Sequence, residues 1–467
     1  MIESSKYREL YGKQVIGYNL GYFGVYTTNM LISVFVFQFY VYTINLNSFI
    51  AALGLFFQLI FGAFFSIIFG VLIDNKKPGK RGKRRPFLLY GLPFWGITSF
   101  MLWIPPWYCP KENSFYLPVT VYYWTVLILN SLSGNLILVA HSSMLPEQSQ
   151  TIQNRKKIAS VGTVFNIFGS FIAMLFPLII QSVLSEPENA KWWESSGKVV
   201  IKIMPFVGGI FTIFGVIAIL ATYSSVDESF LYQTIFKKKK SIIEIFKEMK
   251  RPANDKKFKK FVLASFFIQF AGRIIALAVM PFLIYVLLFQ GAEFFIYMVV
   301  SICCKLGWFF VWRLVLKHVN IIKAFSICLL FSVIASGFEL IYLIEVLSFE
   351  FKVAIFFVSY GTVMGTMYAV GLFQNPLSSA LIDEAAVNSG GNISNVSKIS
   401  GGYSGLNVFM LTIGQAVASI VVGIILIGNN SENSTIITLI MASGGLAYFI
   451  AFLFIMRINL SEIKIKG

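Results

Sequence analysis

The sequence predicts an all-α membrane protein with twelve transmembrane helices in two six-helix bundles. Three observations predict this fold class. The 467-residue chain is 57% hydrophobic and only 13% charged, with a mean hydropathy of +0.75, which lies outside the range of soluble globular domains. Its apolar residues form twelve runs, each close to the ~20 residues that a helix needs to cross a bilayer. Its basic residues gather between alternate runs.

The apolar runs predict helices because they are continuous and too long for the strands of a membrane barrel. Only helices and closed barrels can satisfy the backbone polar groups in lipid. We therefore expect membrane-spanning helices over approximately residues 17–44, 48–73, 87–105, 118–143, 158–183, 200–223, 261–289, 294–316, 324–346, 353–382, 402–427 and 435–456.

The basic residues predict the orientation of these helices. Seven Lys and Arg lie between Lys76 and Arg85, and eleven lie between Lys237 and Lys260. The connections on the opposite side carry few, so the positive-inside rule places both termini in the cytoplasm. The net charge of +17 then reflects topology and attraction to anionic headgroups of the lipid bilayer, not binding to nucleic acid. We expect a multi-pass protein of the cell (plasma) membrane that does not require oligomerisation.

The chain has two halves separated by a basic connection. Residues 1–225 form the predicted N-terminal six-helix bundle, residues 226–260 a cytoplasmic linker, and residues 261–467 the C-terminal six-helix bundle. Within the linker, the apolar residues of 241–252 fall on one face of a predicted helix. We expect this amphipathic helix to lie on the membrane surface.

Four regions of the sequence carry a family resemblance. They are Gly17-Tyr-Asn-Leu-Gly21-Tyr-Phe-Gly24, Gly70-Val-Leu-Ile-Asp74 with Gly82-Lys-Arg-Arg-Pro86, the 241–252 stretch, and Leu381-Ile-Asp383-Glu384 with Tyr403-Ser-Gly405 and Ile413-Gly414-Gln415-Ala416. These regions resemble the major facilitator superfamily, and within it the glycoside–pentoside–hexuronide:cation symporters, which include melibiose permease. The resemblance implies the major facilitator fold and transport of a small molecule by alternating access of the two bundles.

The chain departs from that family at the cation site. Aligned on the shared motifs, the positions of two carboxylates in the second helix, one in the fourth and a lysine in the eleventh are Gly62, Ser66, Leu138 and Thr412. Sodium is a hard cation that needs oxygen ligands, so the sequence does not support sodium coupling. We expect a proton as the coupling ion, with uniport as the alternative.

Three ionisable residues lie inside predicted spans of the second half. Arg273 and Lys305 fall near the bilayer midplane, where a bare charge costs at least about 2.5–3.5 kcal/mol, and Glu339 lies toward the outer half. Glu339 could pair with one of the cations as a structural ion pair. Alternatively, the cations contact an anionic or strongly polar substrate. In a third interpretation Lys305 or Glu339 changes charge as a coupling group, because burial favours neutral forms, and Arg273 is a fixed anchor.

Polar side chains within the spans supply a candidate substrate site. The resemblance implies that the first, fourth, seventh and tenth helices line the cavity. Amides and phenols suit a sugar, whose hydroxyls donate and accept and whose ring faces stack on aromatics. The alternative is hydrogen bonding between helices, worth about 0.6 kcal/mol each. The candidate substrate-binding residues are Tyr22, Tyr26, Asn29, Asn130, Asn135, Asn166, Arg273, Tyr368, Gln374, Asn375, Asn407 and Gln415.

The basic loop after the second span predicts a cytoplasmic gate. Asp74 ends one helix near the start of the next, where a carboxylate can accept backbone N–H bonds and pair with Arg84 or Arg85. Such a charged contact would hold one conformation and break when the bundles move. The alternative is a solvated turn whose charges only stop membrane transfer.

The remaining residues exclude other classes of function. His141 ends the fourth predicted span, and we expect a solvated histidine there, with a proton relay as the alternative. With two histidines and scattered cysteines, the chain has no credible metal site. It has no phosphate-binding glycine loop and no set of catalytic residues in its spans. We therefore expect no enzyme activity, no cofactor and no ATP-driven transport.

These observations predict a secondary active transporter that moves a sugar or glycoside, including an acidic one, with a proton. A transporter of a lysophospholipid or another amphiphile is the alternative within transport. A membrane sensor that binds its ligand without moving it is the alternative outside transport.

Overall fold

The computed structural model describes residues 9–77, 79–149, 151–228, 243–244, 250, 252–344, 347–388 and 396–459. The chain divides into two compact units, residues 1–242 and 243–467. Most of the predicted amphipathic stretch, 241–252, lies outside the described residues, so its helix stays a prediction.

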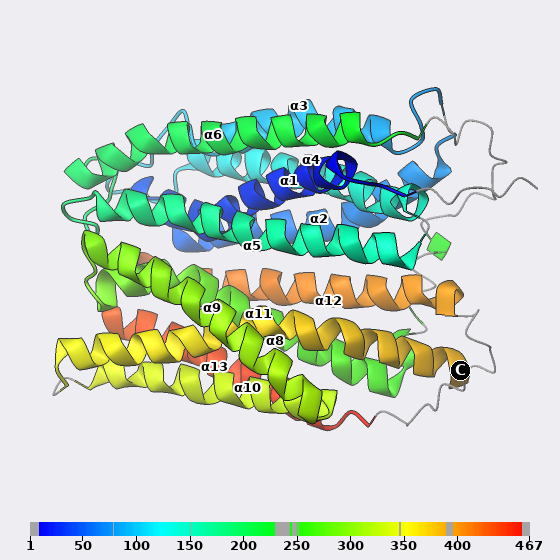
Figure 1. Cartoon of the computed structure of the whole chain (residues 1–467). Coiled ribbons are helices and arrows are strands. Elements are labelled where there is room, and N and C mark those ends of the chain that lie inside the picture. Colours follow the sequence, from blue (N-terminus) through cyan, green and yellow to red (C-terminus); the bar gives the residue numbers. More distant parts are fainter. Residues whose placement is uncertain are drawn as a thin grey trace, which may run out of the picture. The chain divides into compact units, whose positions relative to one another are not determined.

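The described residues of the first unit form six long α-helices, which lie lengthwise beside one another (Figure 1). Helix α1 packs against α5 and α6, α4 packs against α2 and α3, and α3 packs against α6. The elements are α1 (Lys13–Gln38), the π-helix η1 (Phe39–Thr43), α2 (Ser48–Asn75), α3 (Arg85–Met101), α4 (Leu117–Gln148), α5 (Ile152–Ser182) and α6 (Ser195–Ser225).

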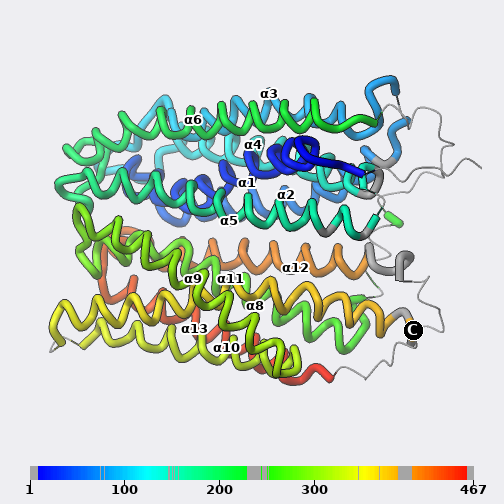
Figure 2. Tube along the Cα trace, in the orientation of Figure 1, coloured from blue at the N-terminus to red at the C-terminus, as the bar shows by residue number. Residues whose placement is uncertain are grey.

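The second unit repeats this packing with six helices of its own, which the trace in Figure 2 follows. Helix α8 packs against α12 and α13, α11 packs against α9 and α10, and α10 packs against α13. The elements are α8 (Lys256–Pro281), the π-helix η3 (Phe282–Val286), α9 (Ala292–His318), α10 (Ile321–Phe338), η4 (Glu339–Leu343), α11 (Phe349–Asn388), α12 (Val396–Ile425), η6 (Gly428–Ser431) and α13 (Ser434–Met456).

The two units share one backbone register through their first two helices. Helix α1 ends in the π-helix Phe39–Thr43, and α8 ends in the π-helix Phe282–Val286, 243 residues later. The chain then turns through a residue of positive φ in both units, Asn45 at 66° and Leu288 at 50°, again 243 residues apart. Helices α2 and α9 end at the same separation. Each residue of α1 or α2 therefore has a structural counterpart 243 positions later.

Short polar side chains fix where several helices begin. Asn47 accepts the backbone N–H groups of Phe49 and Ile50 at 3.0 and 3.4 Å, and Asn320, Asn433 and Asp255 cap α10, α13 and α8 in the same manner. The first N–H groups of a helix have no partner within the helix, so these caps satisfy donors that are costly to leave unpaired near lipid.

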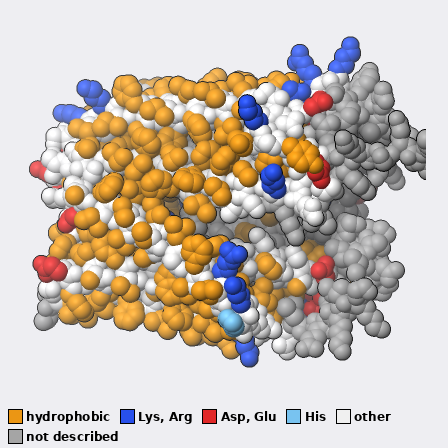
Figure 3. All heavy atoms as spheres, viewed as in Figure 1, with side chains coloured by type: hydrophobic (Ala, Val, Ile, Leu, Met, Phe, Trp, Pro, Cys, Tyr) orange, Lys and Arg blue, Asp and Glu red, His pale blue; other side chains and the backbone are white. Residues whose placement is uncertain are grey.

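The surfaces of the helices are those of a membrane protein. Eleven described helices are long and apolar enough to cross a bilayer, and α3, with 17 residues, is shorter. On α6 the exposed residues Phe206, Ile210, Ile213 and Ile217 recur every three or four positions and form one apolar stripe. Hydrophobic side chains cover most of the face of each unit in Figure 3. The predicted helical, multi-pass membrane protein is confirmed, and the cytoplasmic location of the termini stays a prediction.

Three loops are bonded together at the end of the first unit opposite the basic loop. Trp192 donates its backbone N–H to the Thr43 carbonyl and its indole N–H to the Cys109 carbonyl, both at 2.8 Å. Burial raises the pKa of the Cys109 thiol to about 12. This cysteine is therefore a protonated packing residue at neutral pH.

The glycine-rich start of α1 allows a close approach to α6. A Cβ atom on Gly24 would lie 2.7 Å from the Ala218 Cβ and 2.9 Å from the Gly215 Cα, and one on Gly21 would lie 2.5 Å from the Thr222 hydroxyl oxygen. Backbone and Cβ atoms cannot move aside as the end of a long side chain can. The two helices therefore pack at a distance that only glycine permits at these positions.

Gly24→Leu should lower the stability of the protein. The added side chain overpacks the α1–α6 contact, at a cost of about 1–3 kcal/mol, which thermal unfolding in detergent would report as a lower melting temperature. Gly307→Leu is the matched control, because a Cβ there meets nothing within 4 Å. Equal melting temperatures for the two variants would contradict the close packing.

Candidate functional site

Three polar residues of α8 contact two neighbouring helices in the second unit. Ser265, Gln269 and Arg273 are spaced four apart and so share one face. The Gln374 amide donates to the Ser265 hydroxyl at 3.3 Å, and the Gln415 amide donates to the Gln269 carbonyl oxygen at 2.6 Å. We call this set the α8 ladder; its members are Ser265, Gln269, Arg273, Gln374, Gln415 and Ser419.

Arg273 is the charged member of the α8 ladder. Its side chain is 8% exposed, and its Nε donates to the Ser419 hydroxyl at 3.1 Å. A guanidinium carries five N–H donors in a planar fork that matches the two oxygens of a carboxylate. A permanent cation among amides and hydroxyls can hold an anionic or hydroxyl-rich ligand.

Sequence reasoning selected Arg273, Gln374 and Gln415 but missed Gln269 and Ser265. The signal was present, because both lie at multiples of four residues before Arg273 and continue its helix face. The other predicted residues of this unit are less connected. Asn375 is exposed, the Asn407 side-chain oxygen has no hydrogen-bond partner among the described residues, and the Tyr368 side chain lies outside the described part of α11.

Two tyrosines form the corresponding face of α1 in the first unit. The Tyr22 and Tyr26 rings stack with centroids 5.8 Å apart and planes inclined by 13°, and the Tyr26 hydroxyl bonds the Ser170 hydroxyl of α5 at 2.9 Å. In the 243-residue register Tyr22 and Tyr26 are the counterparts of Ser265 and Gln269. Equivalent positions of α1 and α8 therefore carry polar side chains. We call the pair in the first unit the Tyr22–Tyr26 face.

The predicted asparagines of the first unit have different environments. Asn130 donates to Ser99 at 2.7 Å and to Thr98 at 3.3 Å, so its amide joins α4 to α3. Asn135 donates to Ser131 on its own helix at 3.3 Å. The amide of Asn29 lies beside Gly134, and the Asn166 side-chain oxygen has no hydrogen-bond partner among the described residues.

The two predicted coupling residues lie on different elements of the second unit. Lys305 is half-buried on α9, at the counterpart of Gly62 in the 243-residue register. Glu339 begins η4 and is 1% exposed. Within the described part of the chain, neither Glu339 oxygen accepts a hydrogen bond. The phenols of Tyr342 and Tyr448 lie within electrostatic range of this carboxyl group.

The carboxylate that accepts backbone N–H bonds at the start of α3 is Glu228. Its Oε2 atom accepts the N–H groups of Lys83, Arg84 and Arg85 at 3.0, 2.8 and 2.8 Å. Its side chain is 0% exposed, which fits a carboxylate bound by several donors at a helix N-terminus. The Asp74 side chain, which we expected in this role, lies outside the described residues.

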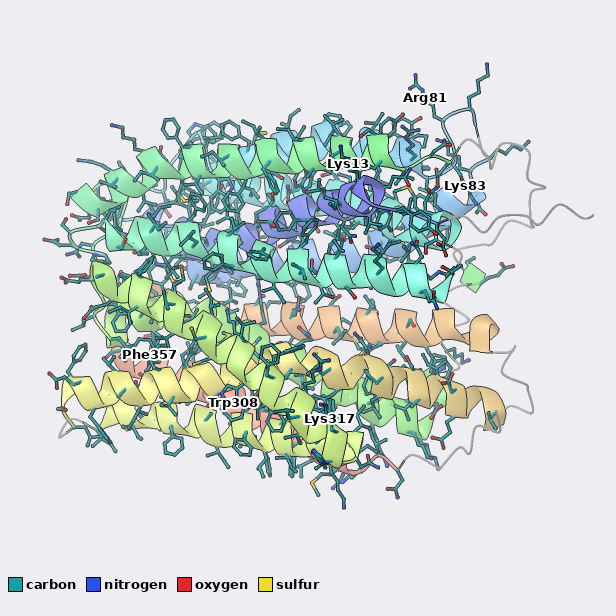
Figure 4. The ribbon with its side chains drawn as sticks, viewed as in Figure 1. Lys13, Arg81, Lys83, Trp308, Lys317 and Phe357 are labelled. Carbon is teal, nitrogen blue, oxygen red and sulfur yellow. The ribbon has the colours of Figure 1, made fainter. Side chains whose placement is uncertain are left out.

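Arg85 and a glycine complete this contact. The Arg85 Nε donates to the Tyr223 carbonyl at 2.7 Å, and its guanidinium lies 4.0 Å from the centroid of the Tyr223 ring. Gly82 has a φ of +88°, and a Cβ on it would lie 2.3 Å from the Glu228 Cβ. Arg81 and Lys83 lie in the loop ahead of α3 (Figure 4). Sequence reasoning missed Glu228 because it lies far along the chain, just after α6.

The second unit has its own charged contact at the start of α8. Lys257 forms an ion pair with Glu384 of α11, and the Tyr403 hydroxyl donates to the Asp255 carboxylate at 3.1 Å. Glu384 and Tyr403 both belong to motifs that carried the family resemblance. Their contacts join α8, α11 and α12 at one end of this unit.

Comparisons with known proteins agree with this architecture. A family profile described as MFS/sugar transport protein matches residues 17–462. Among solved structures, the nucleoside transporter NupG superposes with a TM-score of 0.64 at 12% identity, over 96% of this chain and 100% of that chain. The xylose transporter XylE from E. coli, in an inward open conformation, gives 0.61 at 13% identity, over 97% and 96%.

A third solved structure has a similar degree of likeness. The bacterial homologue of the human lysosomal transporter Spinster, in an inward-facing and unoccupied conformation, gives a TM-score of 0.65 at 14% identity, over 95% of each chain. No curated protein matched the chain by sequence. At these identities the solved structures establish the fold alone.

Glu228→Ala should loosen the start of α3. The substitution removes the acceptor of three backbone N–H groups, and a hydrogen bond to a charged group contributes about 1.5–3 kcal/mol. Trypsin should therefore cleave the 76–85 loop faster. Glu228→Gln should cause a smaller increase, since it keeps one acceptor oxygen. Glu112→Gln, at an exposed position, is the control. Unchanged cleavage of Glu228→Ala would show that the contact does not hold this helix end.

Proposed function

We propose that this chain, which belongs to the MFS/sugar transport protein family, carries a sugar or glycoside across the plasma membrane by alternating access, together with a proton. Family membership makes it a secondary transporter with the major facilitator fold, and it confirms the resemblance seen in the sequence. The substrate class and the coupling ion are the parts that we propose. The observation that supports the substrate class is the α8 ladder, with one buried guanidinium among amides and hydroxyls.

The donor and acceptor pattern of the two helix faces supports a sugar. The amides of Gln269 and Gln415 each carry donors and acceptors, as hydroxyl groups of a sugar do. The phenol rings of the Tyr22–Tyr26 face offer flat apolar surfaces on which the faces of a pyranose can stack. The Gln415 amide donates to the Gln269 carbonyl oxygen, and a sugar hydroxyl can replace either partner.

Arg273 supports an acidic sugar within that class. A permanent cation buried at mid-depth of a membrane helix is costly unless it meets a counter-charge or a strongly polar group. A uronate supplies a carboxylate for the guanidinium fork as well as hydroxyls for the amides. We therefore propose that Arg273 contacts an acidic sugar.

The pattern of ionisable residues supports a proton as the coupling ion. Gly62 and Ser66 occupy the family's cation positions and offer no carboxylate. Glu339 is a buried carboxyl group whose oxygens accept no hydrogen bond from the described residues, and such a group is costly as an anion. We propose that Glu339 binds the coupled proton and that Lys305, the other ionisable side chain proposed for coupling, responds to the same charge change.

The basic loop supports a gate at its end of the first unit. Glu228 accepts the backbone N–H groups of Arg84 and Arg85, and the Arg85 guanidinium contacts Tyr223 of α6, so the start of α3 is bonded to the end of α6 where the basic loop lies. We propose that Asp74, Arg84 and Arg85 form this gate and that it faces the cytoplasm.

Arg273→Ala should abolish recognition of an acidic sugar. In proteoliposomes we expect uptake of D-glucuronate to fall at least tenfold, because a charge-assisted contact of about 1.5–3 kcal/mol is lost. Arg273→Lys should recover part of it, and Arg313→Ala, at an exposed position, should stay within about twofold of the parent. Transport of lysophosphatidylcholine in place of any sugar would favour the amphiphile alternative.

Glu339→Gln should uncouple transport from the proton gradient. The amide keeps the shape of the side chain but cannot exchange a proton, so sugar accumulation driven by an imposed pH gradient should disappear while sugar counterflow continues. Glu350→Gln, at an exposed position, is the control. Accumulation by Glu339→Gln at the parental rate would contradict proton binding at this carboxyl. Sugar uptake by the parent protein that does not depend on the pH gradient would favour uniport.

A further inference from the structure

His141 is buried in the first unit, which corrects the expectation of a solvated histidine. Helix α4 continues beyond it to Gln148, and its side chain is 5% exposed. It packs against α1 beside the Tyr22–Tyr26 face. His141 is thus a buried titratable side chain that belongs neither to the α8 ladder nor to the proposed coupling residues.

His141 and Tyr18 form a reciprocal contact between α4 and α1. The His141 Nε2 lies 2.7 Å from the Tyr18 carbonyl oxygen, and the Tyr18 hydroxyl donates to the His141 carbonyl oxygen at 2.9 Å. A carbonyl oxygen can only accept, so Nε2 carries the proton in this bond. The neutral ring then has its lone pair at Nδ1, and a second proton can bind only there. No hydrogen bond from a described residue engages Nδ1.

The imidazole ring continues the aromatic row of α1. Its centroid lies 4.2 Å from that of Tyr18 and 5.9 Å from that of Tyr22, and Tyr22 stacks on Tyr26. An aromatic face attracts a cation, with a larger effect when the cation is desolvated. The charge state of His141 is therefore felt at the first ring of the Tyr22–Tyr26 face.

The same stretch of α1 also receives a side chain from α6. The Thr222 hydroxyl donates to the Gly17 carbonyl at 2.6 Å and accepts the Gly21 N–H at 2.8 Å. A hydroxyl placed between groups of the helix ladder is a recognised cause of helix bending. The backbone that carries Tyr22 is thus engaged from two sides, by Thr222 and by His141.

Among the described residues, the surroundings of His141 offer no charged partner. The titratable groups that face the ring are the phenols of Tyr18 and Tyr22 on α1, while α6 and α5 present the hydroxyls of Thr222 and Ser170 to that helix. No Asp, Glu, Lys or Arg is among its ring or hydrogen-bond contacts in the described residues. Burying an imidazolium without a counter-charge is costly, so the charged form needs an anion from outside the protein.

We propose that His141 is a proton-binding site linked to the substrate on the Tyr22–Tyr26 face. When an anionic, hydroxyl-rich substrate occupies that face, Nδ1 takes a proton from water, because the negative charge of the substrate lowers the cost of the imidazolium. When the substrate leaves, the proton returns to water. The proposal rests on the proposed function for its ligand, and it assigns the first unit a proton site separate from Glu339.

Nitrogen NMR of the purified protein labelled with ¹⁵N-histidine tests the site directly. The chain has two histidines, so His141→Gln and His318→Gln assign both signals. We expect His141 to keep a proton on Nε2 throughout and to gain one on Nδ1, at a pH at least one unit higher with D-glucuronate than with D-glucose. A Nδ1 signal that stays constant between pH 5 and 8 in every condition would overturn the proposal.

Binding affinity supplies the second arm. One linked proton changes the Kd for D-glucuronate up to tenfold per pH unit, so we expect that dependence in the parent and in His318→Gln. Because Glu339 is also proposed to bind a proton, this comparison is made in the Glu339→Gln background. There we expect the dependence to vanish when His141→Gln is added, and the amide of that glutamine can still donate to the Tyr18 carbonyl. Tyr18→Phe removes the reciprocal hydroxyl, and it should lower the melting temperature while keeping the pH dependence, which a purely structural histidine would not explain.

The outcomes separate this proposal from the proposed function. Glucuronate binding whose pH dependence is the same in Glu339→Gln and in the Glu339→Gln/His141→Gln double variant would overturn the histidine site and leave sugar transport standing. If neither sugar binds the parent protein, sugar transport fails. In that case protonation of Nδ1 cannot depend on either sugar, and the substrate-linked histidine site is overturned with it.

Discussion

The cost of an unpaired polar group in hydrocarbon governs where this chain places its polar side chains. In the second unit Gln269 and Arg273 bond residues of α12, and in the first unit Asn130 bonds residues of α3. Each bond holds two helices at a defined height relative to one another, because a slip of one turn would break it. Glu339 departs from this pattern, as do several buried hydroxyl and indole groups, since neither of its oxygens accepts a bond within the described residues.

The 243-residue register allows the backbone and the side chains of the two units to be compared position by position. They share the π-helical end of the first helix and the positive-φ turn after it, which are properties of the backbone. Their side chains differ at equivalent positions: Met30 corresponds to Arg273 and Gly62 to Lys305. The scaffold is therefore duplicated while the fixed cations belong to the second unit alone, and the first unit offers aromatic rings and a histidine in their place.

Sequence reasoning captured what depends on local pattern and missed what depends on contacts across the chain. Hydropathy located the helices because each span is a continuous apolar run. Glu228 escaped notice because its partners begin at Lys83, and no local spacing connects the two. His141 was misjudged for a different reason: the apolar run ends near it, but α4 continues to Gln148 and carries the ring against α1. Gln269 was within reach, since its spacing from Arg273 follows the helix period.

The contact between His141 and Tyr18 determines which nitrogen of the imidazole can take a second proton. Nε2 is committed to the Tyr18 carbonyl, so protonation at Nδ1 leaves that bond in place and adds a positive charge beneath Tyr22. An anion on the Tyr22–Tyr26 face lowers the cost of that charge, and by linkage the charge strengthens binding of the anion to the same extent. The proton and the anion then favour being bound together or not at all, and the pair is electrically neutral.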